Sequence, residues 1–208
     1  NKIKEHEDYI FYENERIKAN KGKWNKYFGN DNPIYFEIGS GAGNFLVRNA
    51  ELHSDINYIR LEIRFKRVVF CAKKAKKRSL KNIVFMRKFS EEIHDIFGDN
   101  EVDGLYVNFP EPWPKERRIK NRVIKKELFD QLNVVMKKGG KLFLKTDLTM
   151  YYEYVLELMK EITGYKVVYS TDDLYSTEKI TDNIPTEFEQ LFTGKGVKIK
   201  YIEIEKEV

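Results

Sequence analysis

Cysteine and histidine are scarce in this chain, which has one cysteine and three histidines in 208 residues. A single cysteine excludes an internal disulfide and favours a reducing compartment such as the cytoplasm. Cys71 stands among Val68, Val69 and Ala72, so we expect it to be buried in apolar surroundings. The histidines are far apart and show no metal-ligand spacing, so we expect no metal site.

Long apolar runs are also missing. No segment approaches the roughly 20 consecutive apolar residues of a membrane span, and the first residues lack the apolar core of a secretory signal. We therefore expect a cytoplasmic protein with no membrane partner. The chain begins with Asn1 instead of methionine, which suggests that some N-terminal residues are missing.

Charged residues are abundant in this chain. Charged residues make up 34% of the sequence, and the net charge is +5 with an isoelectric point near 9.0. This is a modest bias toward anionic partners. Two basic clusters carry much of it, residues 73–78 and residues 115–126, and the second holds seven basic residues in twelve. A solvated helix face is the usual interpretation of the first cluster.

Strand-like and helix-like segments alternate along most of the chain, which predicts a doubly wound, mostly parallel sheet in one α/β domain. The expected strands are residues 34–38, 57–63, 82–86, 102–109, 141–146, 165–170 and 197–205. Only a short helix near residues 186–192 fits between the last two strands, so we expect an antiparallel C-terminal strand. The prediction is a seven-stranded domain over residues 24–208, preceded by a loosely docked helical arm over residues 1–23.

A glycine-rich loop, Glu37–Gly43 (E-I-G-S-G-A-G), follows the first expected strand and opens a helix. Glycines there let the backbone approach a ligand closely. The dinucleotide fingerprint has its third glycine one residue later, where Asn44 stands, so a cofactor without a pyrophosphate fits better. Glu62 ends the second strand 23 residues after Gly39, where a carboxylate can bind a ribose diol. Together these features favour an adenosine-bearing cofactor.

A proline-rich basic segment, Asn108–Lys126 (N-F-P-E-P-W-P-K-E-R-R-I-K-N-R-V-I-K-K), comes directly after the fourth strand. Its three prolines fix the backbone as a rigid loop. The loop holds Glu111 and Trp113 at the carboxyl end of a strand, where ligands of open α/β sheets bind. A carboxylate backed by basic residues suggests chemistry on a nucleic acid, and Trp113 either stacks on a base or anchors the loop. A solvated basic loop is the alternative.

The motifs occur in an order that resembles the bacterial tRNA (guanine-7-)-methyltransferases, which are class I S-adenosylmethionine-dependent enzymes. The resemblance runs from about Gly22 to the C-terminus. The motifs are the glycine loop, Leu61–Val68 (L-E-I-R-F-K-R-V), the proline-rich segment, Lys145–Asp147 (K-T-D) and Thr186–Glu189 (T-E-F-E). The resemblance implies a Rossmann-like fold, S-adenosyl-L-methionine as cofactor and methylation of guanosine nitrogen-7 in tRNA, usually in the variable loop.

The resemblance also implies a role for each matching position. The cofactor would be held by Glu37, Gly39, Gly41, Gly43, Glu62 and Phe89. The tRNA would be contacted by Lys115, Asp147, Thr186, Glu187, Phe188 and Glu189. Glu111 would be the catalytic residue and would stabilise the positive charge that develops on the methylated guanine. From the residues alone, Asp147 fits a helix N-cap equally well, and Thr186 with Glu189 fits a capping box.

Four positions depart from the family pattern. Glu111 stands where Asp is usual, Ala42 where Lys is usual, and Phe89 where an Asp often lies near the adenine, and the usual His near Arg118 is missing. The departures at Glu111, Ala42 and Phe89 leave a non-catalytic RNA-binding homologue as an alternative. A nicotinamide-dependent reductase is a second alternative, because residues 175–179 match the Y-x-x-x-K spacing. The sequence fits a monomer or a homodimer.

Overall fold

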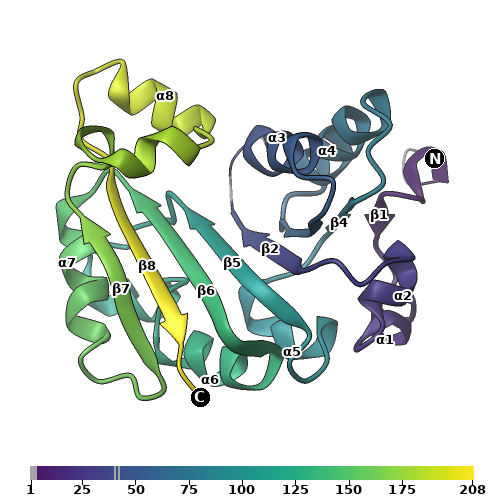
Figure 1. Ribbon diagram of the computed structural model, residues 1–208, viewed down its shortest axis with the longest axis horizontal. Helices are drawn as coiled ribbons and strands as arrows, with labels where there is room; N and C mark the ends of the chain where they lie inside the picture. The colour runs from purple at the N-terminus through teal and green to yellow at the C-terminus, as the bar shows by residue number, and fades with distance from the viewer. Residues whose placement is uncertain (1–3, 40, 42) are drawn as a thin grey trace.

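The computed structural model describes residues 4–39, 41 and 43–208, and Figure 1 shows a single sheet with helices packed on both faces. Ala42 lies outside the described residues. In the described part of the chain, the sheet has eight strands in the order β1-β4-β3-β2-β5-β6-β8-β7. The strands are β1 (Ile10–Phe11), β2 (Ile34–Ile38), β3 (Asn57–Leu61), β4 (Ile83–Met86), β5 (Val102–Asn108), β6 (Met136–Thr146), β7 (Tyr165–Thr171) and β8 (Lys200–Lys206).

Helices connect the parallel strands. They are α1 (Asn14–Asn20), α2 (Trp24–Phe28), α3 (Asn44–Leu52), α4 (Phe65–Lys77), α5 (Ile93–Ile96), α6 (Lys126–Val135), α7 (Thr149–Leu158) and α8 (Glu187–Thr193), with 3-10 turns at η1 (Lys4–His6), η2 (Ser90–Glu92), η3 (Glu116–Asn121), η4 (Leu174–Ser176) and η5 (Glu178–Asp182). Strands β1 to β6 pair in parallel, and β8 is antiparallel to both β6 and β7. The predicted α/β fold with an antiparallel C-terminal strand is therefore confirmed.

Two apolar cores flank the sheet, because successive side chains of a strand point to opposite faces. On one face, α3 and α4 pack over β3 and β4 through residues such as Leu46 and Val68. On the other face, α5, α6 and α7 pack over β2, β5, β6 and β8 through residues such as Leu105, Leu132 and Val155. Helices therefore cover both faces of the sheet, with α3 and α4 on one face and α5, α6 and α7 on the other (Figure 1).

The N-terminal residues are more tightly integrated than the expected loosely docked arm. Strand β1 pairs with β4 and adds an eighth strand at the edge of the sheet. Phe11 is fully buried, and its ring packs edge-on against Trp24 with 5.1 Å between ring centroids. Ile17 of α1 is also buried. The prediction of seven strands missed β1 because a strand of two residues is too short to show an alternating pattern.

The strand order prepares a ligand site. The chain winds outward from β2 through β3 to β4 and then returns to place β5 beside β2, so the carboxyl ends of β2 and β5 flank a topological switch point, where ligands bind in such sheets. The segment between β7 and β8 carries η4, η5 and α8, and α8 stands above the upper ends of β6 and β8 in Figure 1. Within the described residues, no helix has the length and apolar character that a bilayer crossing requires.

Candidate functional site

A cavity of about 320 Å³ lies at the carboxyl ends of β2, β3 and β5. Four of the predicted site residues line it together: Gly39 after β2, Glu62 after β3, Phe89 after β4 and Glu111 after β5. Trp113 lines it as well. The structure therefore brings together, at one opening, residues that the sequence separates by as many as 74 positions.

Glu62 is nearly fully buried at this cavity, and one of its carboxylate oxygens accepts no hydrogen bond. Its Oε1 accepts a hydrogen bond of 2.8 Å from the backbone N–H of Arg64. Its Oε2 accepts no hydrogen bond, although Arg60 Nη2 lies 3.6 Å away and Arg67 Nη1 3.8 Å away. A buried acceptor without a donor is unfavourable by about 1–3 kcal/mol. A hydroxyl group bound in the cavity would satisfy it.

Glu37 does not face the cavity with a free carboxylate. Arg60 Nη1 donates to its Oε2 at 2.9 Å and Asn108 Nδ2 to its Oε1 at 3.2 Å, and all three side chains are buried. The same guanidinium donates to the carbonyl oxygens of Gly39 at 3.2 Å and Gly41 at 2.8 Å. Glu37 therefore acts through Arg60, which fixes the shape of the glycine loop.

Arg60 and Asn108 are contributors to the site that the sequence interpretation missed. The signal for Arg60 is present in the sequence, since a charged residue stands in the middle of β3, whose residues are all buried. A charge is almost never fully buried unless it is paired. An arginine in such a strand therefore predicts a carboxylate partner on the neighbouring strand, and Glu37 of β2 lies directly opposite in the register.

Gly43 shows why the third glycine comes one residue earlier than in the dinucleotide fingerprint. Its φ of +79° lies in the left-handed region that favours glycine. A Cβ atom there would lie 2.2 Å from Cys71 Sγ, so no other residue fits. Gly43 therefore lets the start of α3 pack closely against Cys71 of α4. Cys71 is fully buried as predicted, and burial raises the pKa of its thiol.

The proline-rich loop has a strained backbone and an exposed carboxylate. Phe109 and Trp113 have φ values of +49° and +41°, which non-glycine residues rarely adopt. Such strain is stored where the surroundings impose it, often at functional sites. Glu111 lies between these two residues, is exposed, and pairs with no other side chain among the described residues. Its charge is therefore available to a ligand.

The basic residues behind Glu111 divide into two groups. Lys115, Arg117 and Arg118 are exposed, as a surface for RNA requires, and the Arg118 guanidinium lies 5.5 Å from the centre of the Trp113 ring. Arg122 belongs to the same basic segment but is buried. Its Nε donates to the carbonyl of Pro112 at 2.9 Å, and its guanidinium stacks over a tyrosine of α7 at 4.1 Å. Arg122 anchors the loop.

The T-E-F-E motif is largely a structural element. Thr186 Oγ1 accepts from the Glu189 N–H at 3.0 Å and Glu189 Oε2 accepts from the Thr186 N–H at 3.1 Å, so the predicted capping box is confirmed. Glu189 has no exposed surface and accepts from Lys145 Nζ at 3.0 Å and the Tyr175 hydroxyl at 3.1 Å. Burial lowers the pKa of Lys145, and Glu189 opposes that shift. Glu189 therefore has no exposed surface in this structure with which to make the expected contact with tRNA.

The same contacts argue against a reductase. The Tyr175 hydroxyl donates to Glu189, whereas Lys179 Nζ donates to Glu203 at 2.6 Å. The two residues of the Y-x-x-x-K spacing therefore donate hydrogen bonds to two different buried carboxylates and do not form a catalytic pair. Instead, Lys145 of the K-T-D motif and Glu189 of the T-E-F-E motif form one buried ion pair.

The other predicted substrate residues lie near the carboxyl ends of β2, β5 and β6. Asp147 is half-buried and does not cap α7, because Leu148 is the N-cap residue and its N–H donates to Thr146 Oγ1 at 3.2 Å. Glu187 Oε1 accepts from the first N–H of α3 at 3.1 Å, which joins α8 to the glycine loop. Phe188 is 37% exposed and therefore offers a surface to a ligand.

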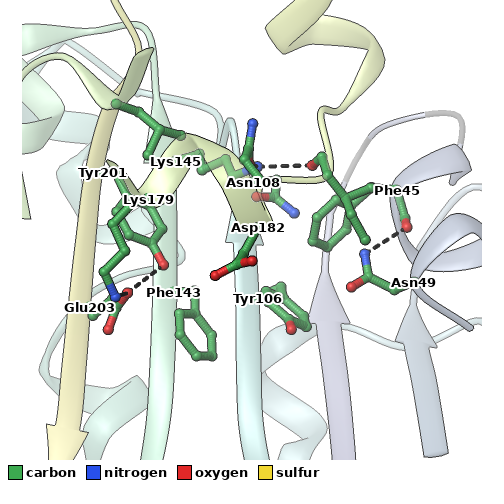
Figure 2. A pocket seen from close by; sticks show the side chains of 13 residues that line it. Phe45, Asn49, Tyr106, Asn108, Phe143, Lys145, Lys179, Asp182, Tyr201 and Glu203 are labelled. Carbon is green, nitrogen blue, oxygen red and sulfur yellow. Dashed lines mark hydrogen bonds and ion pairs between the residues drawn. The ribbon is translucent and has the colours of Figure 1, made fainter. Parts of the chain in front are cut away.

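A second cavity, of about 230 Å³, lies over β5, β6 and β8 on the face that α3 covers. Figure 2 shows the aromatic rings of Tyr106 and Phe143 along its floor, with the paired Lys179 and Glu203 at one side. None of the residues predicted to hold the cofactor or to act in catalysis lines this cavity. Among the described residues, no group of three potential metal ligands is close enough to hold an ion. The first cavity is therefore the candidate site.

Comparison with known proteins agrees with this geometry. A family model described as "Putative methyltransferase" matches residues 31–202. The tRNA (guanine-N(7)-)-methyltransferase of Bacillus subtilis (strain 168) is 38% identical over 186 residues, covering 89% of this chain and 86% of that protein. A bifunctional glycosyltransferase/methyltransferase of Fusobacterium nucleatum subsp. nucleatum is 49% identical over 206 residues, which is 99% of this chain. The chain spans 32% of the length of that longer protein.

Solved structures share the fold. An antibiotic-related methyltransferase superimposes with a TM-score of 0.64 at 17% identity, covering 89% of this chain and 93% of that one. The 16S rRNA methyltransferase KamB superimposes with a TM-score of 0.62 at 13% identity, covering 93% and 92%. At these identities the likeness concerns the fold alone, which is that of class I methyltransferases.

Proposed function

The chain belongs to this methyltransferase family, and we propose that it transfers a methyl group from S-adenosyl-L-methionine to nitrogen-7 of a guanosine in tRNA. The observation that carries the proposal is the cavity of about 320 Å³, because Gly39, Glu62, Phe89 and Glu111 line it together. The relative in Bacillus subtilis, named for this reaction, supports the substrate. We further propose a cytoplasmic monomer or homodimer that acts on the variable loop.

The residues of the cavity fit S-adenosyl-L-methionine. The unused buried oxygen of Glu62 suits a ribose hydroxyl. Phe89 is 58% exposed on the cavity wall, where its ring suits an adenine. The backbone of Gly39 and Gly41, held by Arg60, suits the methionine part, which needs close approach to the chain. Glu37 contributes by holding Arg60.

The chemistry asks little of the protein beyond alignment and charge. When bound, S-adenosyl-L-methionine supplies a methyl group on a positively charged sulfur. Guanine nitrogen-7 carries a lone pair and no proton, so no residue has to act as a base. Holding the base in line with the methyl group is the main contribution. The base gains positive charge, and the unpaired carboxylate of Glu111 stabilises that charge as it develops.

Exposed residues around the cavity would bind the tRNA. Lys115, Arg117 and Arg118 would contact phosphates, which orient the RNA without reading its sequence. Asp147 would accept from the N–H groups of guanine, and Phe188 would pack against a nucleoside. We assign Thr186, Glu187 and Glu189 to positioning α8 over the glycine loop.

The test is transfer of a labelled methyl group to an unmodified tRNA transcript. A matched transcript made with 7-deazaguanosine keeps base pairing but has a carbon in place of nitrogen-7. We expect label in the first transcript and none in the second. Equal labelling of both would place the reaction at another atom, and no labelling of any transcript would favour the non-catalytic RNA-binding homologue.

A further inference from the structure

The charges of the chain are distributed very unevenly. Residues 63–90 contain 11 of the 38 basic residues and none of the 33 acidic residues. The rest of the chain carries 27 basic and 33 acidic residues, so it is acidic overall. The positive net charge of the protein therefore comes from this one segment, whose centre is α4. A solvated helix face accounts for the cluster at residues 73–78, whereas the absence of acidic residues extends over 28 residues and needs another explanation.

Helix α4 presents a regular row of exposed residues on its outer face. Val68, Cys71, Ala72 and neighbouring apolar residues are buried in the core beneath the helix. The opposite face shows Lys66, Phe70, Lys73 and Lys77, at spacings of four, three and four residues. Spacings of three and four place side chains in line along a helix. We call this row, Lys66–Phe70–Lys73–Lys77, the α4 stripe.

The lysines of the α4 stripe have no acidic partner among the described residues. Lys66, Lys73 and Lys77 form no ion pair with any described residue. Some lysines elsewhere are neutralised, as Lys160 is by Glu157 at 2.5 Å and Lys137 is by Asp103 at 2.8 Å. The positive charge of the stripe is thus directed at solvent.

An exposed aromatic ring interrupts the row. Phe70 is 50% exposed between basic residues, and Lys74 Nζ lies 4.1 Å from the centre of its ring. Leaving a phenylalanine in water is unfavourable, whereas an aromatic ring among cations suits a nucleoside that stacks while its phosphates are neutralised. The stripe also starts at the candidate site, because Arg64, which lines the first cavity, directly precedes α4.

We propose that the α4 stripe is a second tRNA-binding surface, with phosphates against Lys66, Lys73 and Lys77 and a nucleoside against Phe70. From Lys66 to Lys77 the helix rises about 16 Å, enough for several successive phosphates. This inference rests on the proposed function and adds a second contact, separate from the proline-rich loop. An anionic membrane is disfavoured as partner, because a basic helix that lies on a membrane buries its apolar face there, and the apolar face of α4 is in the core.

The test compares the salt dependence of tRNA binding in three versions of this chain: wild type, the stripe variant K66Q/K73Q/K77Q, and the control variant K21Q/K26Q/K138Q, whose lysines are also exposed and without an ion pair among the described residues. The control removes three exposed lysines at the edge where the strands begin. Each lost phosphate contact lowers the slope of log K against log salt by about 0.7 on single strands and 0.9 on a duplex. We expect the stripe variant to lose about 2 to 3 from the slope and the control to match wild type.

A third variant, Phe70→Ala, separates stacking from charge. We expect it to weaken tRNA binding roughly 5-fold or more, as the loss of one aromatic–base contact does, while the salt slope stays at the wild-type value. A stripe variant whose slope equals that of wild type and control overturns the proposal. Loss of binding to phosphatidylserine vesicles with an unchanged tRNA slope overturns it in favour of a membrane. Methyl transfer by wild type is measured separately, so failure of the proposed function and failure of the stripe are distinguishable.

Discussion

Two carboxylates from the sequence motifs, Glu111 and Glu189, lie beyond the same ends of the strands, but one is exposed and the other is buried. Glu189 has no exposed surface, accepts hydrogen bonds from Lys145, Tyr175 and the Thr186 backbone, and closes a capping box. Glu111 is exposed, pairs with no described side chain and lies on a loop with a strained backbone. Both stand in short motifs that resemble the same family, yet only one is free to act on a ligand.

Burial and hydrogen bonding divide the motif residues into those that build the site and those that contact a ligand. A buried polar group that other residues satisfy stabilises the fold and fixes geometry. A carboxylate oxygen at a cavity that no protein donor reaches, buried in Glu62 and exposed in Glu111, is left for a ligand. Arg60 and Arg122 then build the site, because each holds a loop that lines the cavity, and Lys145 holds α8 through Glu189.

The largest effect should come from breaking the buried pair. Lys145→Met leaves the Glu189 carboxylate buried without its cation, which typically lowers the free energy of unfolding by about 3–5 kcal/mol. Urea denaturation measures this change in the free energy of unfolding. The double variant K145M/E189L removes both charges and should recover much of the loss. A loss below about 1 kcal/mol in the single variant would show that the pair is not what holds α8.

The next effect concerns turnover instead of stability. Glu111→Gln keeps the shape of the side chain and removes its charge, so we expect turnover to fall roughly 10²–10³-fold, the range for losing one preorganised electrostatic group. Because the interaction strengthens only as the methyl moves, affinity for tRNA and cofactor should stay near wild type. Single-turnover methyl transfer and tRNA binding measure the two quantities.

Glu111→Asp is the matched control for that substitution. It keeps the charge and shortens the side chain by one methylene to the residue usual in the family. Activity at or above wild type would mean that the loop tolerates the longer carboxylate, whereas a strong loss would mean that the loop is adjusted to Glu111. If Glu111→Gln turns over like wild type, the carboxylate has no catalytic part and alignment alone carries the reaction.

A smaller effect is expected at Glu62. Glu62→Gln retains an oxygen for the Arg64 N–H and loses the charge, so it tests the unused Oε2 with less damage than Ala would cause in a buried position. Loss of one charge-assisted hydrogen bond to a ribose should weaken S-adenosyl-L-methionine binding by roughly 1.5–3 kcal/mol. Titration calorimetry measures the dissociation constant. An unchanged value would remove Glu62 from the cofactor site.

Much of this site could be predicted from the sequence, and the limits are physical. The strands from Ile34 onward follow from hydrophobic periodicity, which can be read from short stretches of sequence. The placement of Glu62 and Glu111 after the carboxyl ends of strands follows directly from those strand positions. Burial of Arg122 and Glu189 could not be read locally, because each depends on groups far along the chain, such as the tyrosines of α7 and Lys145. Basic residues in a row look alike in sequence, whether they face solvent or carbonyl oxygens.

The smallest effect tests this division inside the basic loop itself. Arg118 is exposed and Arg122 is buried against the Pro112 carbonyl, although only three residues separate them. Arg118→Gln should lower the salt slope of tRNA binding by about 0.7–0.9, one phosphate contact, with stability within about 0.5 kcal/mol of wild type. Arg122→Gln should leave the slope unchanged and lower the urea midpoint, because the guanidinium that anchors the loop is lost. If both variants change the slope equally, the loop opens when tRNA binds and Arg122 reaches the RNA, and the separation between the residues that build the site and those that bind the substrate would not hold there.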